Sequence, residues 1–180
     1  MQIPETKRLS FRLMTQNDGE MLYQLDQDIE VMRFINGGKR TTRDEITNVL
    51  LPRMKSYTTP ERGWGIWAVF LKETNQYIGW ILVRPMDFFS DKPQFDNLEL
   101  GWRFERASWG KGYATEAAKA IADELARKTD IKKFCAIADE DNYGSIGIMK
   151  KLGMTFIKQY IHHDPLGDWD VVYYERSIAK

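Results

Sequence analysis

The sequence lacks the features that would place it outside the ordinary globular proteins. Its 180 residues include a single cysteine, so no internal disulfide can form. The first residues show neither the basic nor the apolar segment of a signal peptide, and no apolar run approaches the roughly 20 residues that cross a bilayer. These absences predict a cytoplasmic protein with no membrane partner.

Charge of either sign is also not in excess. Lys+Arg 26 against Asp+Glu 26 gives a formal net charge of zero, whereas nucleic-acid-binding proteins usually carry a broad positive field. The pairs Lys132–Lys133 and Lys150–Lys151 are short local runs, so we expect no nucleic-acid partner. Hydrophobic residues at 43% and charged residues at 29% are typical of a globular protein and predict one domain over residues 1–180.

Hydrophobic spacing predicts the helices and strands. Leu9, Phe11 and Leu13 alternate with polar residues, as in a half-buried strand. Capping boxes at 17–20 and 42–45 predict two helices with a turn at Gly37–Gly38 between them, and Pro52 is expected to kink or end the second helix. Further strands are expected at 64–71, 77–83, 98–104, 134–138, 154–161 and 171–178, and further helices near 114–125 and 145–151.

The predicted element order is βααβββαβαββ. This order indicates an α/β (α+β) fold, with one mixed, mostly antiparallel sheet of about seven strands flanked by helices. The connection 84–97 carries Phe88, Phe89 and Phe95 and is too long for a tight hairpin. It either covers a site or a partner surface, or its apolar side chains pack back on the domain.

A glycine-containing loop at residues 109–116, W-G-K-G-Y-A-T-E, lies between strand 98–104 and the next helix. Gly110 and Gly112 let backbone N–H groups converge, and the helix adds its unpaired N–H groups and positive dipole end, an arrangement that suits a pyrophosphate. Lys111 either adds charge or points to solvent, and glycines here also suit a plain tight turn. The dinucleotide fingerprint fails because Thr115 replaces its third glycine, and no P-loop Lys-Ser or Lys-Thr pair follows.

These letters, together with L-E-L-G-W-R-F at 98–104, resemble the acetyl-CoA loop of the GNAT superfamily of N-acetyltransferases. The superfamily loop Q/R-x-x-G-x-G/A places Gly112 and Ala114 at its fourth and sixth positions. Trp109 stands at the first, which departs from the general pattern and resembles the Rim-type branch of ribosomal-protein N-terminal acetyltransferases. A second block, N-Y-G-S-I at 142–146 with K-K-L-G-M at 150–154, is similar to the family's N-x-x-[AS]-x(6)-L-G-[FM] segment, so the resemblance spans essentially the whole chain.

The resemblance implies a sheet that splays open between strands 98–104 and 134–138, with acetyl-CoA as acetyl donor in the gap. It implies that the backbone of 102–104 pairs with pantetheine and that the loop holds the pyrophosphate. Asn142 and Ser145 either contact the cofactor or cap the following helix. The implied cofactor contacts are Trp102, Arg103, Phe104, Trp109, Gly110, Lys111, Gly112, Tyr113, Ala114, Thr115, Asn142 and Ser145.

Acetyl transfer to an amine needs a neutral nucleophile, a stabilised oxyanion and a proton for the departing thiolate. Ser145 is the candidate partner of the thiolate, because many family members place a hydroxyl there or a Tyr four residues later, where this chain has Met149. Glu99, an acid in an apolar strand, is the candidate base. Alternatively, Glu99 pairs with an Arg across the sheet, and a water relay makes a single base unnecessary.

The remaining cysteine, histidine and tryptophan side chains are interpreted as packing or cleft-lining residues. Cys135 lies among apolar residues without a His nearby, so we assign it to core packing rather than to an acetyl-cysteine. His162-His163-Asp164 lacks further ligands at metal-site spacing, so no metal is predicted, and a polar loop beside the acceptor cleft is expected there. Trp67, Trp80 and Trp169 either line that cleft or belong to the core.

The predicted function is transfer of acetyl from acetyl-CoA to a primary amine, on a protein N-terminus or a small molecule, by direct attack in a ternary complex. The alternative is an acyl-CoA-binding sensor or scaffold module with little transferase activity. A homodimer is compatible with the sequence, which does not identify the acceptor.

Overall fold

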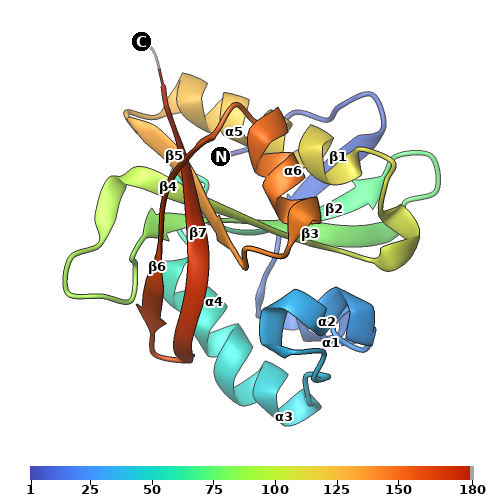
Figure 1. Cartoon of the computed structure of the whole chain (residues 1–180). Coiled ribbons are helices and arrows are strands. Elements are labelled where there is room, and N and C mark those ends of the chain that lie inside the picture. The colour runs from blue at the N-terminus through green and yellow to red at the C-terminus, as the bar shows by residue number, and fades with distance from the viewer. Residues whose placement is uncertain (179–180) are drawn as a thin grey trace.

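The computed structural model describes residues 1–178 and is built on one seven-stranded sheet of order β1-β2-β3-β4-β5-β7-β6 (Figure 1). Neighbouring strands are antiparallel except β4 and β5, which are parallel. The predicted mixed, mostly antiparallel sheet is therefore confirmed. The strands are β1 (Leu9–Leu13), β2 (Gly65–Leu71), β3 (Tyr77–Met86), β4 (Gln94–Phe104), β5 (Lys133–Ala138), β6 (Thr155–Asp164) and β7 (Gly167–Ser177).

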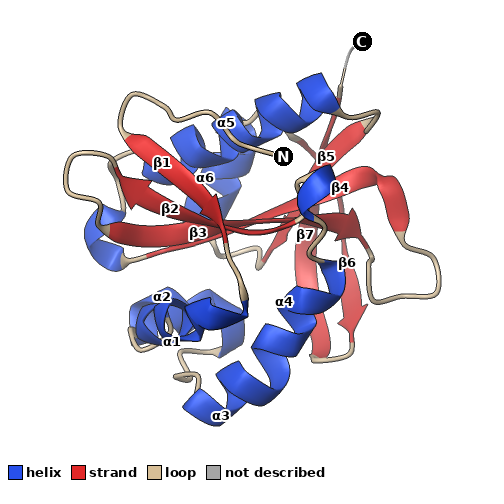
Figure 2. Cartoon of the chain, turned by 180° about the vertical axis from the view of Figure 1, so that it is seen from behind, coloured by secondary structure: helices blue, strands red, loops and turns tan. Residues whose placement is uncertain are grey.

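Helices cover both faces of the sheet, with α5 and α6 on one face and α1 to α4 on the other (Figure 2). The α5 side holds the larger core, where Ala117, Ile121 and Leu125 of α5 pack with Leu98 and other buried strand residues. The helices are α1 (Gly19–Leu25), α2 (Ile29–Asn36), α3 (Arg43–Glu45), α4 (Leu51–Tyr57), α5 (Tyr113–Lys128) and α6 (Tyr143–Lys151). No helix within residues 1–178 is long and apolar enough to cross a membrane.

The first helical region differs from the prediction of a single helix capped at Asn17. Thr15 and Asp18 form the capping box of a short 3-10 turn, and α1 follows from Gly19. The chain then breaks before α2, whose first turn is capped by the Asp28 carboxylate, which accepts from the Glu30 N–H at 2.9 Å. A second carboxylate, Asp26, is buried at the break and accepts from Thr41 and Arg103, so tertiary contacts override the helical pattern.

The second predicted capping box is confirmed. Thr42 Oγ1 accepts from the Glu45 N–H at 3.1 Å, and Glu45 accepts from the Thr42 N–H at 2.7 Å. Of the two outcomes predicted for Pro52, a kink or an end, the end of the helix is wrong, because α4 continues to Tyr57. A π-helical turn over Ile46–Leu50 precedes Pro52, and this wider turn relieves the clash and missing N–H that proline brings to a regular helix.

The long connection after β3 is shorter than predicted because both flanking strands extend, leaving residues 87–93 between them. Phe88 and Phe89 pack edge-on against Tyr57, with ring centroids 5.9 and 6.2 Å away. Of the two predicted interpretations, packing back on the domain is therefore correct for these two rings. Phe95 lies within β4 and stacks on Trp64.

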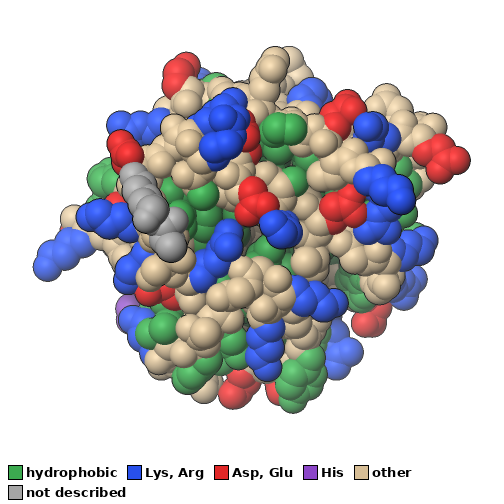
Figure 3. Space-filling view, turned by 90° about the horizontal axis from the view of Figure 1, so that it is seen from above, with side chains coloured by type: hydrophobic (Ala, Val, Ile, Leu, Met, Phe, Trp, Pro, Cys, Tyr) green, Lys and Arg blue, Asp and Glu red, His purple; other side chains and the backbone are tan. Residues whose placement is uncertain are grey.

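The sheet splits between β4 and β5. Among the described residues these strands pair only at Asn97–Lys133, Leu98–Phe134 and Glu99–Cys135. Beyond Glu99, β4 stays with β3 as far as Phe104, while β5 follows β7 as far as Ala138. One backbone edge of residues 100–104 is therefore free to pair with a ligand, as the predicted splayed sheet requires. On the α5 side of the molecule, basic and acidic side chains are interspersed (Figure 3).

Candidate active site

The first part of the site bridges the split in the sheet. Trp102 of β4 donates its indole N–H to Ser145 Oγ of α6 at 3.1 Å. The Ser145 N–H donates to Asn142 Oδ1 at 3.1 Å, so the capping role considered for Asn142 is confirmed. Because Ser145 Oγ accepts the indole N–H, its own hydroxyl proton can be donated to a different acceptor. Met149, at the position where the resemblance implies a Tyr in many family members, is fully buried in the core.

The loop before α5 has the backbone conformation that its glycines predict. Gly110 and Gly112 have φ values of +73° and +80°, in the left-handed region that side chains other than glycine rarely adopt. The indole N–H of Trp109 donates to Phe104 O at 2.9 Å and holds the loop against the end of β4. Trp109 thus has a structural partner that its position in the motif did not reveal, while the Lys111 side chain is exposed.

The start of α5 presents its backbone to a ligand. Within the described chain its N-cap, Gly112, offers no side-chain capping bond, and the first helical bond runs from the Glu116 N–H to Gly112 O at 3.0 Å. The preceding N–H groups, of Tyr113, Ala114 and Thr115, therefore have no intrahelical acceptor. Free N–H groups at a positive dipole end make this turn suitable for an anion such as a pyrophosphate.

An N-terminal brace, which the sequence did not reveal, supports this loop. Arg8 donates from Nε to Glu116 at 2.7 Å and from Nη1 to Lys111 O at 3.0 Å, and its guanidinium lies 4.4 Å from the Tyr113 ring centroid. Thr6 Oγ1 donates to the same Glu116 carboxylate at 2.6 Å. Burial acts to raise the pKa of Glu116, but the bonds from Thr6 and Arg8 outweigh it and lower that pKa.

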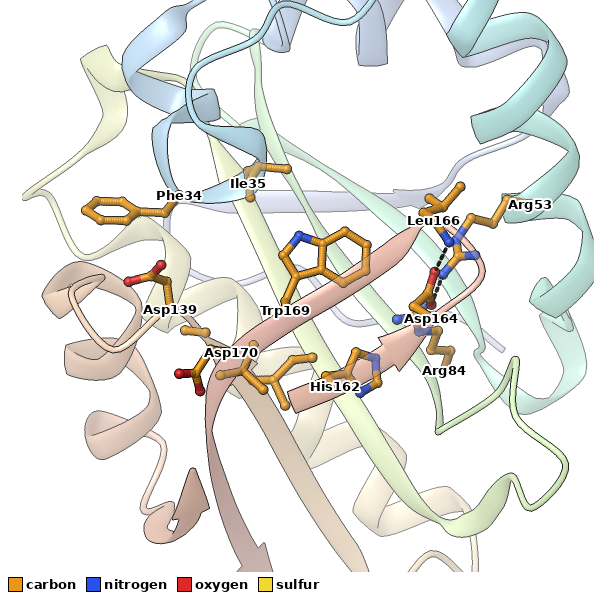
Figure 4. A pocket seen from close by; sticks show the side chains of 13 residues that line it. Phe34, Ile35, Arg53, Arg84, Asp139, His162, Asp164, Leu166, Trp169 and Asp170 are labelled. Atoms are coloured by element: carbon orange, nitrogen blue, oxygen red, sulfur yellow. Dashed lines mark hydrogen bonds and ion pairs between the residues drawn. The ribbon is translucent and has the colours of Figure 1, made fainter. Parts of the chain in front are cut away.

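A pocket of about 270 Å³ opens on the other face of the sheet (Figure 4). Phe34 and Ile35 of α2, with Leu166 and Trp169 of the β6–β7 hairpin, give it apolar walls. Ile137 and Ala138 also line it, and both belong to the part of β5 that has separated from β4. The pocket thus borders the split from the side opposite α5 and α6.

Two buried ion pairs lie at one end of this pocket. Arg84 of β3 donates from Nε to Glu99 Oε2 at 2.7 Å, and Arg53 of α4 pairs with Asp164 of β6. Burial acts to lower the pKa of Arg84, but attraction to Glu99 outweighs it and holds that pKa above its ordinary value. Sequence reasoning missed Arg53 and Arg84, because contacts across 111 and 15 residues leave no local signal.

Glu99 lies at the last point where β4 and β5 pair, next to the split. The alternative interpretation of Glu99 as the partner of an Arg across the sheet is confirmed, since Arg84 is its register neighbour on β3. Its predicted role as a base remains a prediction, and a base at this position must work while bonded to a guanidinium.

The remaining candidates separate into core and pocket residues. Cys135 is fully buried, and burial raises the pKa of its thiol well above the ordinary value, which confirms its assignment to packing. Trp169 lines the pocket, whereas Trp67 is in the main core and Trp80 packs against the second one. His162, His163 and Asp164 lie in β6 rather than in the predicted polar loop, because ladder pairing continues to the turn at 165–166.

In the part of the chain that the structure describes, the residue types that bind metals do not cluster. Within residues 1–178, no group of three or more His, Cys, Asp or Glu side chains is placed to hold a metal ion. The ring of His163 instead lies 2.9 Å from the Asp168 carboxylate on the neighbouring strand.

The sheet thus carries a glycine loop on one side of its split and a pocket on the other. The acetyltransferase (GNAT) domain family matches residues 8–155, and the chain belongs to this family. It is therefore an acetyltransferase enzyme, as predicted.

Two relatives in sequence agree with this membership. The uncharacterized N-acetyltransferase YnaD of Bacillus subtilis is 30% identical over 176 residues, which cover 94% of this chain and 93% of that protein. The FsC-acetyl coenzyme A-N(2)-transacetylase of Aspergillus fumigatus is 26% identical, over 87% of this chain and 66% of that protein.

Solved structures share the fold. An acetyltransferase of the GNAT family from Bacillus anthracis superposes with a TM-score of 0.76 at 25% identity, covering 98% of both chains. The ribosomal L7/L12 α-N-protein acetyltransferase RimL, solved with coenzyme A, has a TM-score of 0.74 at 18% identity and covers 98% of this chain and 97% of its own. Likeness at this identity is a likeness of fold, so the Rim-type branch stays a prediction.

Proposed function

We propose that this protein transfers the acetyl group of acetyl-CoA to a primary amine, and that residues 1–180 act as one acetyltransferase domain. The observation that carries the proposal is the position of the two half-sites. The N–H groups at the start of α5 and the pocket beside Trp169 lie on opposite faces of the sheet, and the split between β4 and β5 joins them. Two substrates approaching from these faces meet in the split.

In this proposal the cofactor contacts follow the free backbone. The N–H groups between Trp109 and Thr115 bind the pyrophosphate, and the free edge of 102–104 pairs with the amides of pantetheine. The Arg103 side chain bonds Asp26 on the other face, so its proposed cofactor contact is made by its backbone. Asn142 holds the turn that places Ser145 at the split.

The chemistry requires one bond to form and one to break. Acetyl-CoA supplies an acetyl group activated as a thioester. As the amine nitrogen forms its bond to the acetyl carbon, the carbon–sulfur bond breaks, and the amine proton passes to Glu99 directly or through water. The Ser145 hydroxyl, fixed by Trp102, donates a hydrogen bond to the departing sulfur.

Direct transfer is favoured over a covalent acetyl-enzyme. The only cysteine, Cys135, is buried beside Glu99, and its thiol pKa is raised, so it is a poor thiolate nucleophile. The proposed order is therefore a ternary complex, in which amine and thioester are bound together before transfer.

The role of Glu99 can be tested by its pH dependence. Glu99→Gln keeps an oxygen to accept from Arg84 but removes the basic carboxylate. If Glu99 takes the proton of a bound ammonium, the variant should lose about tenfold in kcat/KM at pH 6 and much less at pH 9 with a peptide α-amine as acceptor, because that amine is already neutral at pH 9. An equal loss at every pH would assign Glu99 a structural role instead.

Calorimetric titration with acetyl-CoA, CoA and ATP, followed by mass spectrometry of a panel of primary amines, tests the function itself. We expect micromolar binding of acetyl-CoA and CoA, no binding of ATP, and at least one acetylated amine. Binding without any acetylated product would support the acyl-CoA-binding sensor instead. Absence of acetyl-CoA binding would contradict both.

A further inference from the structure

Resting on the proposed acetyl transfer, we infer that the acceptor is a small amine that also carries a carboxylate, which the guanidinium of Arg84 binds. The pocket beside Trp169 separates its charges, with the guanidinium groups of Arg53 and Arg84 at one end and the exposed carboxylates of Asp139 and Asp170 at the other. An ammonium and a carboxylate on one molecule match these two ends.

Arg84 is a buried donor that has spare hydrogen-bonding capacity. Its side chain is 11% exposed and lines the pocket. Its Nε donates to Glu99, and within residues 1–178 its terminal nitrogens, Nη1 and Nη2, have no side-chain or backbone acceptor. Neither nitrogen is sealed from solvent, so both are open to the pocket and can donate to a ligand oxygen. The paired terminal nitrogens suit the two oxygens of a carboxylate.

The neighbouring charges allow an anion at this end. Asp164 would repel a ligand carboxylate, but it is already paired with Arg53. The Arg53 guanidinium lies 3.7 Å from the Phe89 ring centroid, so Arg53 is held in place as a second cation beside Arg84. The two guanidinium charges together balance the carboxylate charges of Glu99 and Asp164. The terminal N–H groups of Arg84 then remain for a ligand.

The opposite end of the pocket is acidic. Figure 4 shows Asp139 and Asp170 on the side of Phe34, with Trp169 between them and the two arginines. Asp139 directly follows Ala138 at the end of β5, on the strand that borders the split. Acids here attract an ammonium toward the strand that borders the split, and its proton then reaches Glu99 through water. A volume of about 270 Å³ suits a molecule of amino-acid size.

The test compares acceptors that differ only at the carboxylate. Glycine, 4-aminobutanoate, 6-aminohexanoate and phenylalanine are each assayed against their carboxamides, in the wild type and in Arg84→Lys. The lysine keeps a charge for Glu99 but lacks the terminal pair of donors. We expect at least one carboxylate to exceed its carboxamide about tenfold in kcat/KM, and Arg84→Lys to reduce that preference about tenfold. Dividing the acid-to-amide ratio of kcat/KM in the wild type by the same ratio in Arg84→Lys cancels the intrinsic basicity of each amine.

Arg12→Lys is the matched control. Arg12 also pairs with a carboxylate, Asp18, but it does not line the pocket. Its substitution should leave the carboxylate preference unchanged. Thermal unfolding of each variant reports any loss of folding. A second measurement needs no variant: each acid and each amide is titrated into CoA-loaded wild-type protein, and their affinities are compared.

The outcomes separate this inference from the proposed function. Transfer to amines with equal use of acids and amides, or a preference that Arg84→Lys leaves intact, overturns the inference alone. Transfer only to peptide N-termini also overturns it. Binding of acetyl-CoA with no transfer to any amine overturns the proposed function, while the titration of CoA-loaded protein still measures whether the pocket selects carboxylates.

Discussion

The two faces of the site are built in different ways. On the α5 face, residues 109–116 are contiguous, and the arrangement depends on backbone N–H groups and two left-handed glycines. On the opposite face, the pocket draws side chains from α2, α4, β3, β5 and the β6–β7 hairpin. In the proposed function, a local backbone motif thus binds the cofactor, whereas side chains that only the complete fold assembles bind the acceptor.

This difference predicts that a single substitution can remove one function without the other. The cofactor side depends on backbone geometry, so bulk or strain in the loop should abolish binding. The acceptor side depends on side-chain identity, so changes there should alter selectivity while acetyl-CoA binding persists.

The largest effect is expected from Gly112→Trp. Gly112 has a φ of +80° and precedes the first N–H groups of α5, so a bulky side chain strains the loop and fills the anion site. Acetyl-CoA binding should weaken by more than about 100-fold, measured by calorimetry. Gly37→Trp is the control, because Gly37 has a similar φ of +78° with open space around it and lies after α2 on the other face. Equal loss in both variants would contradict the assignment of the loop.

A smaller effect, on rate rather than affinity, is expected from Ser145→Ala. Loss of a hydrogen bond to a developing thiolate should lower kcat by about 10- to 100-fold and leave the affinity for acetyl-CoA nearly unchanged. Trp102→Phe removes the bond between the indole and Ser145 but keeps the hydroxyl. Normal kcat in Ser145→Ala would show that its proposed role toward sulfur is wrong.

The smallest effect concerns the brace under the loop. The pKa of Glu116 is lowered below its ordinary value of 4.5, so the stability that it contributes is present above that value and is lost as the pH falls through the lowered folded-state pKa. Glu116→Gln should therefore cost on the order of 0.5 kcal/mol at pH 7, about 1 to 2 °C in Tm, because the pair is partly exposed. The difference should disappear in acid.

Asp123→Asn provides the comparison for that measurement. Asp123 pairs with Lys119 on the exposed side of the same helix and does not contact the loop. Its substitution should leave Tm nearly unchanged at both pH values. A Glu116→Gln difference that persists below the lowered pKa would contradict the electrostatic account of the brace.

The sequence predicted those parts of the fold that depend on local patterns. Alternating residues located the strands, small apolar residues located α5, and the loop at 109–116 and the cap at Asn142 follow from neighbouring residues. The break between α1 and α2 was not predictable in this way, because it depends on Asp26 contacting Arg103, 77 residues away. The π turn before Pro52 was missed for a related reason, since the packing of α4 keeps the helix going past the proline.

The acceptor side shows the same limit more strongly. Glu99 was found because an acid within an apolar strand is conspicuous, yet its partner Arg84 and the nearby Arg53 were not. Arginines in a sequence with 26 basic residues carry no individual signal. Their burial and their remaining donors become visible only when β3, α4 and β6 are placed together.

The central claim is that donor and acceptor bind on opposite faces and react directly through the split. Initial rates measured while acetyl-CoA and one accepted amine are both varied test this claim most directly. We predict intersecting double-reciprocal lines, because both substrates must be bound before the acetyl group moves. Parallel lines, together with an acetylated protein detected by mass spectrometry in the absence of amine, would contradict the account.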